Sequence, residues 1–267
     1  MADIGFIGMG NMGYAMLKGM LSCFDASGIV FTDASQERME NVEKITNVKY
    51  VNTNAECAKL AKVIILAVKP QYYESVLQDI SNIVKEDDIV ISLAPGIRID
   101  YLSSKLEFNP RIVRVMPNTP ALVGAGITGV AYQKDRFSSD EEKLIENIFR
   151  SIGEMVRVDE ALMNAVVCAS GSSPAYVYMF IEALADSVVK YGMPRDMAYK
   201  FAASSVLGSA KMVLETGEHP GILKDRVCSP GGTTIAGVAA LEEYGFRNAV
   251  FKATDACYEK NQKLQGE

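Results

Sequence analysis

The chain has 267 residues, of which 49% are hydrophobic and 22% are charged, a composition typical of one large or two smaller globular domains. The 27 Lys and Arg residues against 33 Asp and Glu residues give a net charge of −6. With no dense basic cluster, electrostatics do not favour a nucleic-acid partner. The longest apolar runs are too short to span a bilayer, so no membrane association is expected.

The N-terminal residues lack the basic start and the long apolar stretch of a secretory signal, so we expect a cytoplasmic protein. The five cysteines form no close pair in the sequence, which suits a reducing compartment. No Cys or His spacing supports a four-ligand zinc site, and we expect no metal. The single histidine, His219, lies in a polar turn. The reaction is therefore expected to need no histidine base.

The first half of the chain alternates short β-rich runs with helical patterns. The expected strands are Ile4–Gly8, Ile29–Asp33, Lys49–Val51, Val63–Val68, Ile89–Leu93, Ile112–Met116, Ile127–Tyr132 and Met155–Val158. Helical patterns separate them, for example Asn11–Phe24 and Gln71–Ile83. Repeats of strand and helix predict an α/β domain with a parallel sheet and helices on both faces.

The second half of the chain, from about Asp159, is expected to be all-helical. Its clearest helical pattern is Ser172–Tyr191, with Pro174 in the first turn. This segment is apolar on nearly all sides, which requires burial on most faces. We therefore expect a second subunit to cover it. The predicted domains are residues 1–159 and residues 160–267.

A glycine motif, G-x-G-x-x-G, occupies Gly8 to Gly13. It follows an apolar strand pattern and opens a helical one, as a dinucleotide-binding turn requires. Gly8 permits a tight turn, Gly10 lets the backbone approach a pyrophosphate, and Gly13 permits close packing of helix and strand. The free N–H groups and the dipole at the helix start favour phosphate. The alternative is a purely structural glycine turn.

Asp33 ends the second expected strand, twenty positions after Gly13. A carboxylate there can accept hydrogen bonds from an adenosine ribose, which favours NADH, and it would repel a 2′-phosphate. Ser35 and Arg38 lie nearby and could accept that phosphate if Asp33 turned away. Alternatively, Asp33 caps the next helix. Lys69 also follows a strand and could face the cofactor, although a solvated lysine is the alternative.

A second glycine-rich segment, Ser229-Pro230-Gly231-Gly232-Thr233-Thr234, leads into a helical pattern. Its backbone N–H groups and hydroxyls have little steric cover, which suits a small carboxylate. A capped helix start is the alternative for this segment alone.

The whole chain resembles the pyrroline-5-carboxylate reductase family. The motifs that carry the resemblance are spread along the chain: Phe6-Ile7-Gly8-Met9-Gly10-Asn11-Met12, Ala67-Val68-Lys69-Pro70-Gln71, Met116-Pro117-Asn118-Thr119-Pro120, Ser170-Gly171-Ser172-Ser173-Pro174-Ala175-Tyr176, and Leu223-Lys224-Asp225 with Ser229 to Thr234. The resemblance implies a Rossmann-type N-terminal domain followed by an all-helical C-terminal dimerisation domain. It also implies dimers that assemble further, commonly to a decamer.

The resemblance also implies site residues. The substrate carboxylate would be held by Ser229, Gly231, Gly232 and Thr233, and the catalytic Thr234 would place its hydroxyl near the ring nitrogen. Glu160 matches, loosely, an acid near the substrate. The expected cofactor-binding residues, from the glycine motif and the family together, are Gly8, Met9, Gly10, Asn11, Met12, Gly13, Asp33, Ser35, Asn54, Ala67, Val68, Lys69, Pro70 and Ala94.

The implied activity is reduction of 1-pyrroline-5-carboxylate to L-proline with NADPH or NADH, the final step of proline biosynthesis. Two positions depart from the family pattern: Ser173 replaces a common glycine, and Asp33-Ala34 replaces the residues that usually hold a 2′-phosphate. The second departure favours NADH or dual use. The alternatives are a dehydrogenase related to β-hydroxyacid dehydrogenases and a non-catalytic dinucleotide sensor. The first would need a lysine near Ala165–Gly171, where none occurs.

Overall fold

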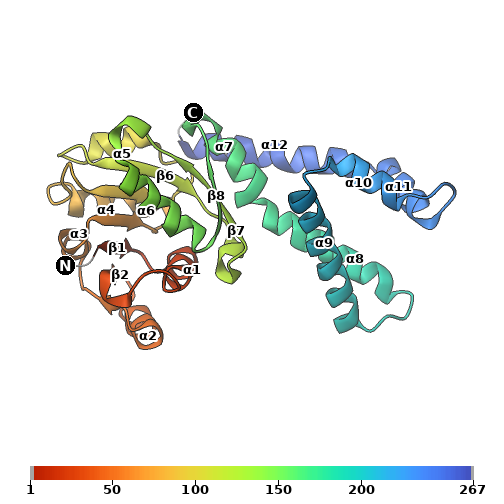
Figure 1. Ribbon diagram of the computed structural model, residues 1–267, viewed down its shortest axis with the longest axis horizontal. Coiled ribbons are helices and arrows are strands. Elements are labelled where there is room, and N and C mark those ends of the chain that lie inside the picture. Colours follow the sequence, from red (N-terminus) through yellow and green to blue (C-terminus); the bar gives the residue numbers. More distant parts are fainter. Residues whose placement is uncertain (1–2, 266–267) are drawn as a thin grey trace. The chain divides into compact units, whose positions relative to one another are not determined.

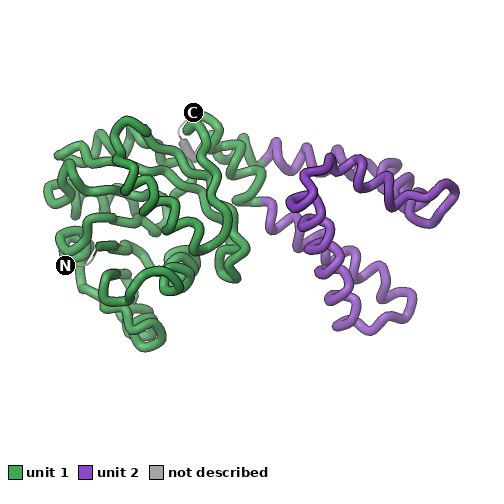
Figure 2. Tube along the Cα trace, in the orientation of Figure 1, with its two compact units in different colours: residues 1–172, 257–267 green, residues 173–256 purple. Residues whose placement is uncertain are grey.

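The computed structural model describes residues 3–265. The chain divides into two units, residues 1–172 with 257–267 (unit 1) and residues 173–256 (unit 2), as Figure 2 shows. Helix α12 (Phe246–Gln265) begins in unit 2 and ends in unit 1. Unit 2 therefore interrupts unit 1 in the sequence. The proposed domain division after Asp159 lies earlier than this change of unit and remains a prediction.

Unit 1 contains an eight-stranded sheet with the spatial order β3-β2-β1-β4-β5-β6-β7-β8 (Figure 1). The strands are β1 (Ile4–Ile7), β2 (Ile29–Thr32), β3 (Lys49–Tyr50), β4 (Val63–Leu66), β5 (Ile89–Ser92), β6 (Arg111–Met116), β7 (Gly126–Ala131) and β8 (Gly153–Arg157). Every residue of β1, β2, β4 and β5 is buried. Such continuous burial explains their apolar runs, because helices cover both faces of the sheet.

The sheet is parallel, as expected, except at one place. Strand β7 pairs antiparallel with β6, while β7 and β8 pair parallel to each other. Only residues 117–125 connect β6 to β7. A parallel return needs a crossover of about a dozen residues or more, so this short connection reverses the chain. The other neighbouring pairs in the sheet are parallel.

Three helices pack on each face of the sheet. Helices α1 (Asn11–Met20), α2 (Gln36–Thr46) and α6 (Ser139–Arg150) contribute to one apolar cluster, and α3 (Asn54–Leu60), α4 (Tyr73–Ile80) and α5 (Ile99–Lys105) contribute to the other. Phe6 belongs to the first cluster and Ile7 to the second, because successive strand residues point to opposite faces. Two helices are shorter than predicted: α1 ends at Met20, and a 3₁₀ turn at Pro70–Tyr72 precedes α4.

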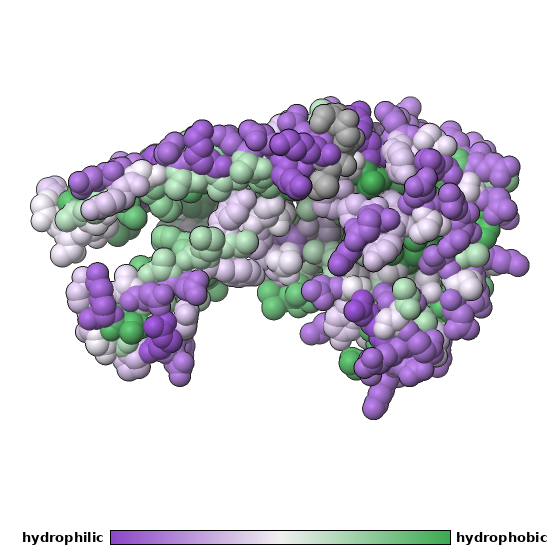
Figure 3. Space-filling view, turned by 180° about the vertical axis from the view of Figure 1, so that it is seen from behind, coloured by the Kyte–Doolittle hydropathy of each residue, from purple (hydrophilic) through white to green (hydrophobic). Residues whose placement is uncertain are grey.

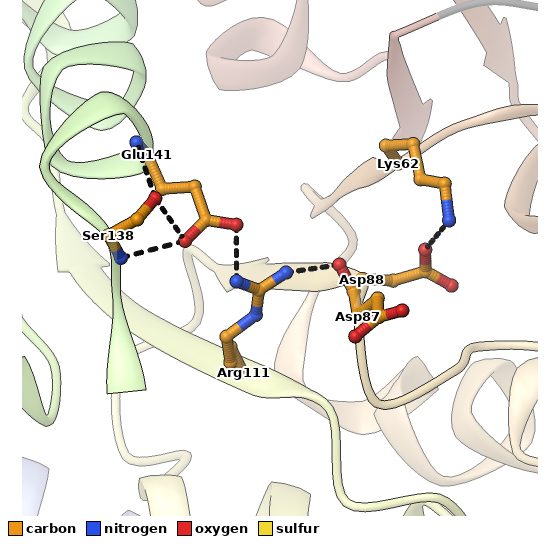
Figure 4. A network of polar contacts seen from close by, with 6 residues as sticks. All are labelled: Lys62, Asp87, Asp88, Arg111, Ser138 and Glu141. Carbon is orange, nitrogen blue, oxygen red and sulfur yellow. Dashed lines mark hydrogen bonds and ion pairs between the residues drawn. The ribbon is translucent and has the colours of Figure 1, made fainter. Parts of the chain in front are cut away.

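A polar network lies where β4, β5 and β6 begin (Figure 4). The ammonium of Lys62 contacts Oδ1 of Asp88 at 3.0 Å. Arg111 donates to the Glu141 carboxylate and to the main-chain oxygen of Asp87. Glu141 also forms a capping box with Ser138 at the start of α6. These contacts link the amino ends of the strands to α6. The network lies at the opposite edge of the sheet from the carboxyl ends of the strands, where open α/β sheets bind ligands.

The chain leaves unit 1 through α7 (Met163–Val166) and a π-helical turn at Val167–Gly171. Within the described residues no strand follows Arg157, as predicted. The helices after this turn are α8 (Ser173–Val189), α9 (Arg195–Thr216), α10 (Pro220–Val227), α11 (Thr233–Glu243) and α12. The predicted helix Ser172–Tyr191 corresponds to α8.

Unit 2 has a small core. Only Ala185, Ala198 and Ala202 form its buried apolar cluster, with residues of α8 and Met193 packed around them. Many large apolar side chains are exposed instead, and Figure 3 shows apolar groups on the surface of these helices. They include Tyr178, Met179, Phe201, Leu207, Leu214, Tyr244 and Phe251. An apolar surface of this extent is typical of an interface with another protein.

Candidate active site

The glycine turn between β1 and α1 has the geometry that the motif predicts. Gly8 has φ +99°, a left-handed conformation that glycine adopts without strain. Gly10 precedes α1, and a Cβ there would meet nothing within 4 Å. A Cβ on Gly13 would lie 2.4 Å from the Gly8 main-chain oxygen. The turn therefore depends on glycine at both ends and leaves open space at the start of the helix.

A cavity of about 620 Å³ lies beside this turn, at the carboxyl ends of β1, β2 and β4. That is the volume range of cofactor sites, and the position is the point where the strand order reverses, at which open α/β sheets bind ligands. The cavity is lined by seven of the predicted cofactor residues, namely Gly8, Gly10, Asp33, Asn54, Ala67, Val68 and Lys69. The predicted residues outside this lining are Met9, Asn11, Met12, Gly13, Ser35, Pro70 and Ala94.

Asp33 joins the end of β2 to the glycine turn. Its Oδ2 accepts a hydrogen bond from the Met9 N–H at 2.7 Å, and its Oδ1 accepts one from the Ser35 N–H at 2.9 Å. A guanidinium nitrogen of Arg38 lies 3.7 Å from Oδ2. Helix α2 is capped by the Ser35 hydroxyl, which accepts from the Arg38 N–H. Asp33 is thus a fixed anion beside the cavity, and the alternative that it caps α2 is wrong.

The far side of the cavity contains the predicted residue Asn54 and, with it, residues that the sequence did not single out. Asn54, at the start of α3, donates from Nδ2 to Oδ2 of Asp79 at 2.9 Å. Asn52, Thr53, Tyr72 and Ser75 also line the cavity, as does Asp79. These residues share a position in the chain, which is the feature that could have identified them. They follow either β3 or β4, and these two strands end at the same edge of the sheet.

Tyr73 is a further residue that sequence analysis missed. Its hydroxyl donates to the Leu66 main-chain oxygen at 2.9 Å, bonds to the Ser92 hydroxyl at 3.0 Å, and accepts from the Ala94 N–H at 3.3 Å. Complete burial raises the pKa of Tyr73 to about 12. The neutral phenol therefore ties together the carboxyl ends of β4 and β5, next to the cavity.

Glu160 is engaged within unit 1. Its Oε1 accepts from the Ile99 N–H at 2.9 Å, at the start of α5, and lies 3.1 Å from a guanidinium nitrogen of Arg114. The Arg114 side chain is 5% exposed. A buried cation of this kind needs a partner, so Glu160 neutralises Arg114 near the end of β6. Its predicted contact with substrate remains a prediction.

The second glycine-rich segment forms a tight turn before α11. Gly231 has φ +68°, and the Gly232 N–H donates to the Ser229 main-chain oxygen at 3.0 Å. A Cβ on Gly232 would lie 2.4 Å from the Ser229 hydroxyl. Thr233 and Thr234 are the first two residues of α11, whose first turn contains no acidic residue. The structure thus gathers the five predicted substrate residues of unit 2 at one helix start.

The single histidine has a structural role. His219 caps α10, and its Nδ1 accepts from the Gly221 N–H at 3.1 Å.

Residues 3–265 contain no candidate metal cluster and no candidate membrane span. Among these residues, no group of three or more His, Cys, Asp or Glu side chains could hold a metal ion. None of the described helices combines the length and the apolar character of a membrane span.

The Rossmann-type sheet, the glycine turn and the cavity beside it define a dinucleotide-dependent oxidoreductase. Residues 3–96 match the family model described as NADP oxidoreductase, coenzyme F420-dependent. Residues 160–264 match the model for pyrroline-5-carboxylate reductase dimerisation.

Similarity over the full length is more specific. The chain is 48% identical to pyrroline-5-carboxylate reductase of Escherichia coli K12, over 98% of this chain and 97% of that one. It is 37% identical to the enzyme of Pisum sativum, over 98% and 95%. The solved reductase of Coxiella burnetii has a TM-score of 0.90 at 33% identity, covering 98% of both chains. The Plasmodium falciparum enzyme, with NADP bound, has a TM-score of 0.89 at 33% identity, over 99% and 98%.

The chain belongs to the pyrroline-5-carboxylate reductase family. Its fold class and its classification as an oxidoreductase acting on a C=N bond are those expected from the sequence. The relatives that match over the full length of the chain are pyrroline-5-carboxylate reductases. This similarity disfavours the two alternatives, a β-hydroxyacid dehydrogenase and a non-catalytic sensor.

Proposed function

We propose that the chain reduces 1-pyrroline-5-carboxylate to L-proline with NADPH or NADH, as the final step of proline biosynthesis. The observation that carries the proposal is the cavity at the glycine turn, in a chain that shares 48% of its residues with a full-length reductase of this name. One helix start in each unit, that of α1 and that of α11, presents main-chain N–H groups that suit the two anionic reactants.

The dinucleotide occupies the cavity of unit 1. Main-chain N–H groups at Gly10, Asn11 and Met12 bind the pyrophosphate, because the start of α1 is open and its dipole favours anions. Ala67, Val68 and Lys69 line this cavity at the carboxyl end of β4, and Ala94 follows the neighbouring strand β5. When bound, the reduced nicotinamide supplies the hydride. Tyr73 holds these strand ends in register and so positions the wall beside the ring.

The substrate carboxylate binds at Ser229, Gly231, Gly232 and Thr233, where the turn before α11 presents N–H groups and hydroxyls. The Thr234 hydroxyl accepts a hydrogen bond from the protonated ring nitrogen and orients the imine carbon. A protonated cyclic imine is already an electrophile, so positioning is the main requirement. Holding two reactants in a near-attack geometry lowers a barrier by about 7–11 kcal/mol in favourable systems. Glu160, whose charge is paired with Arg114, is the further residue that we propose to lie near the substrate.

Thr234→Val tests the role of Thr234. Loss of one oriented polar group should lower kcat about 100-fold and leave dinucleotide affinity nearly unchanged. The measurement is the loss of NADH absorbance on addition of the cyclic imine, with 3-oxo acids as the comparison substrates. Thr234→Ser should retain most activity. Thr254→Val is the matched control, on a threonine whose hydroxyl donates to the main-chain oxygens of Val250 and Phe251 in its own helix. An unchanged kcat in Thr234→Val would remove Thr234 from the mechanism.

Cofactor preference is set by the opposed charges of Asp33 and Arg38. The Asp33 carboxylate, held in place by two main-chain N–H groups, suits the ribose hydroxyls of NADH and repels a 2′-phosphate. Arg38, half exposed at 3.7 Å from it, can pair with that phosphate. We propose that the enzyme uses both cofactors, with Asp33 favouring NADH.

Three variants separate charge from loop geometry. Asp33→Ser should raise the ratio of kcat/KM for NADPH over NADH about fivefold, since charges 4 Å apart in water interact by about 1 kcal/mol. Asp33→Asn keeps an acceptor for the main chain and should raise the ratio similarly. Arg38→Met should lower it. If the ratio stays constant in both Asp33 variants, Asp33 does not read the ribose.

The helical region assembles the enzyme. We propose that residues 160–267 form a homodimer, through which the exposed apolar side chains of unit 2 become buried, and that dimers assemble to a decamer in the cytoplasm. Residues 1–159 then form the dinucleotide-binding domain. Support comes from the match to a dimerisation model and from the small core of unit 2.

A further inference from the structure

Two cysteines lie beside the two places where the chain changes unit. Cys168 is in the π-helical turn Val167–Gly171, four residues before unit 1 ends at Ser172. Cys257 is the first residue of the α12 segment that rejoins unit 1. Both cysteines therefore belong to unit 1, and all of unit 2 lies between them in the sequence.

The helix pairing brings these cysteines face to face. Asn261 on α12 donates from Nδ2 to Oδ1 of Asn164 on α7 at 2.8 Å. Cys257 lies one turn before Asn261, and Cys168 lies one turn after Asn164. Residues four apart share a helix face, so a second contact between antiparallel helices falls at Cys168 and Cys257. The Cys257 thiol also donates to the Ser172 hydroxyl at 3.2 Å, which places it at this same turn.

The two thiols differ in access. Cys168 is 7% exposed, whereas Cys257 is only partly buried. Burial, and then a hydrogen bond with Cys257, raise the pKa of the Cys168 thiol to about 11. An oxidant from solvent should therefore oxidise Cys257 first. Cys168 is then the neighbouring thiol that reacts with the oxidised Cys257 to form a disulfide.

We propose that Cys168 and Cys257 are a site of reversible disulfide formation by hydrogen peroxide. The Cys257 thiolate attacks one peroxide oxygen, the O–O bond breaks, and water leaves after protonation, giving a sulfenic acid. The Cys168 sulfur then attacks the Cys257 sulfur, the S–O bond breaks, and a second water leaves. In sum, two thiols lose two electrons and two protons, and one peroxide becomes two waters. A dithiol reductant reverses the step.

The disulfide would close a covalent loop from residue 168 to residue 257 that contains the whole of unit 2. Both chain connections between the units would then be tied at one point. Cross-linking a loop of this length restricts the unfolded chain, so the oxidised protein should unfold at a higher Tm than the reduced one. The inference does not depend on the catalytic role proposed above.

The test uses the full chain, first reduced and then treated with hydrogen peroxide, with remaining thiols blocked before digestion. Mass spectrometry should find one peptide pair linked through Cys168 and Cys257, lighter by two hydrogen atoms. Of the five thiols, the intact protein should lose two, and dithiothreitol should restore them. The Tm of the oxidised form should rise by several degrees and return on reduction.

Three serine variants complete the test. Cys168→Ser and Cys257→Ser should abolish both the linked pair and the rise in Tm, whereas Cys23→Ser, on an exposed cysteine elsewhere in unit 1, should preserve both. The proposal is overturned if peroxide yields only sulfinic acid, or only intermolecular disulfides through Cys23. It is equally overturned if the linked form has the Tm of the reduced protein. If a variant fails to fold, peptide mapping of the unmutated chain still decides whether Cys168 and Cys257 become linked.

Discussion

The two units bury their apolar side chains in different ways. Unit 1 has two large clusters, one on each face of its sheet, that include fully buried residues such as Phe6, Ile65 and Phe149. In unit 2 the buried apolar cluster consists of only three alanines, while large side chains such as Phe201 and Leu207 are exposed. Apolar burial is the main favourable term in folding. The comparison therefore indicates that unit 1 is stabilised from within and unit 2 by association.

The same contrast holds for the proposed sites. The dinucleotide cavity lies within unit 1 and is bounded by strand ends that Tyr73 and Asp33 hold in place. The turn at Ser229–Thr234 is exposed, and its hydrogen bonds are local. Dinucleotide binding should therefore depend on the stability of unit 1, whereas turnover should depend also on the assembly of unit 2.

The largest expected effect on stability is that of Phe149→Ala in α6. Phe149 is 0% exposed, and removing a buried phenylalanine leaves a cavity that costs about 3–5 kcal/mol. Urea unfolding should show this loss at any protein concentration, because the contacts are internal to unit 1. Phe108→Ala, on a partly exposed residue of the same unit, should cost far less. A loss for Phe149→Ala that disappears at high protein concentration would contradict the comparison.

A charge on the apolar surface of unit 2 should weaken association. Phe201 in α9 is 63% exposed in the single chain, and Phe201→Asp should cost about 2 kcal/mol of association, roughly a 30-fold weaker dimer. Sedimentation equilibrium and activity at low protein concentration measure the change. The matched control is Ile45→Asp, on a residue of unit 1 that is 68% exposed. Equal association in the two variants would mean that Phe201 lies outside the interface.

The smallest effect concerns Tyr73 at the edge of the cavity. Its folded pKa of about 12 lies above the ordinary value of 10, so the folded state keeps the proton longer than the unfolded state. The resulting stability is fully present below pH 10 and is lost as the pH rises to about 12.

Tyr73→Phe should cost about 1 kcal/mol at pH 7 through its lost hydrogen bonds. Between pH 10 and pH 12 the variant should lose stability less steeply than the unmutated chain, as measured by urea unfolding. Tyr72→Phe, on the exposed neighbour, should keep the original slope. Parallel slopes for Tyr73→Phe and the unmutated chain would show that Tyr73 does not cause the dependence.

The strands could be predicted from the sequence to within two residues at each end. Runs such as Val63–Leu66 are apolar throughout because both faces of the sheet are covered. The direction of β7 could not be predicted in this way, since a strand pattern is the same read in either direction. The π-helical turn at Val167–Gly171 likewise has no distinct residue pattern.

The glycine turn was predicted because its spacing encodes its conformation. The partners of Asp33 were not, because one of them is the main-chain N–H of Met9, 24 residues away. A main-chain donor has no residue type to reveal it. The same limit applies to Tyr73, whose partners include the main chain at Leu66 and Ala94. The pair of Glu160 and Arg114 was missed because 46 residues separate them.

The return of α12 to unit 1 affects how the protein is made. Residues 257–265 leave the ribosome after all of unit 2, yet Asn261 is buried in unit 1 against Asn164. A nascent chain can therefore form the sheet early, while the docking surface around α7 stays uncovered until synthesis has passed through unit 2. A stop codon shortly before Cys257 would remove the segment that covers this surface and leave it uncovered permanently.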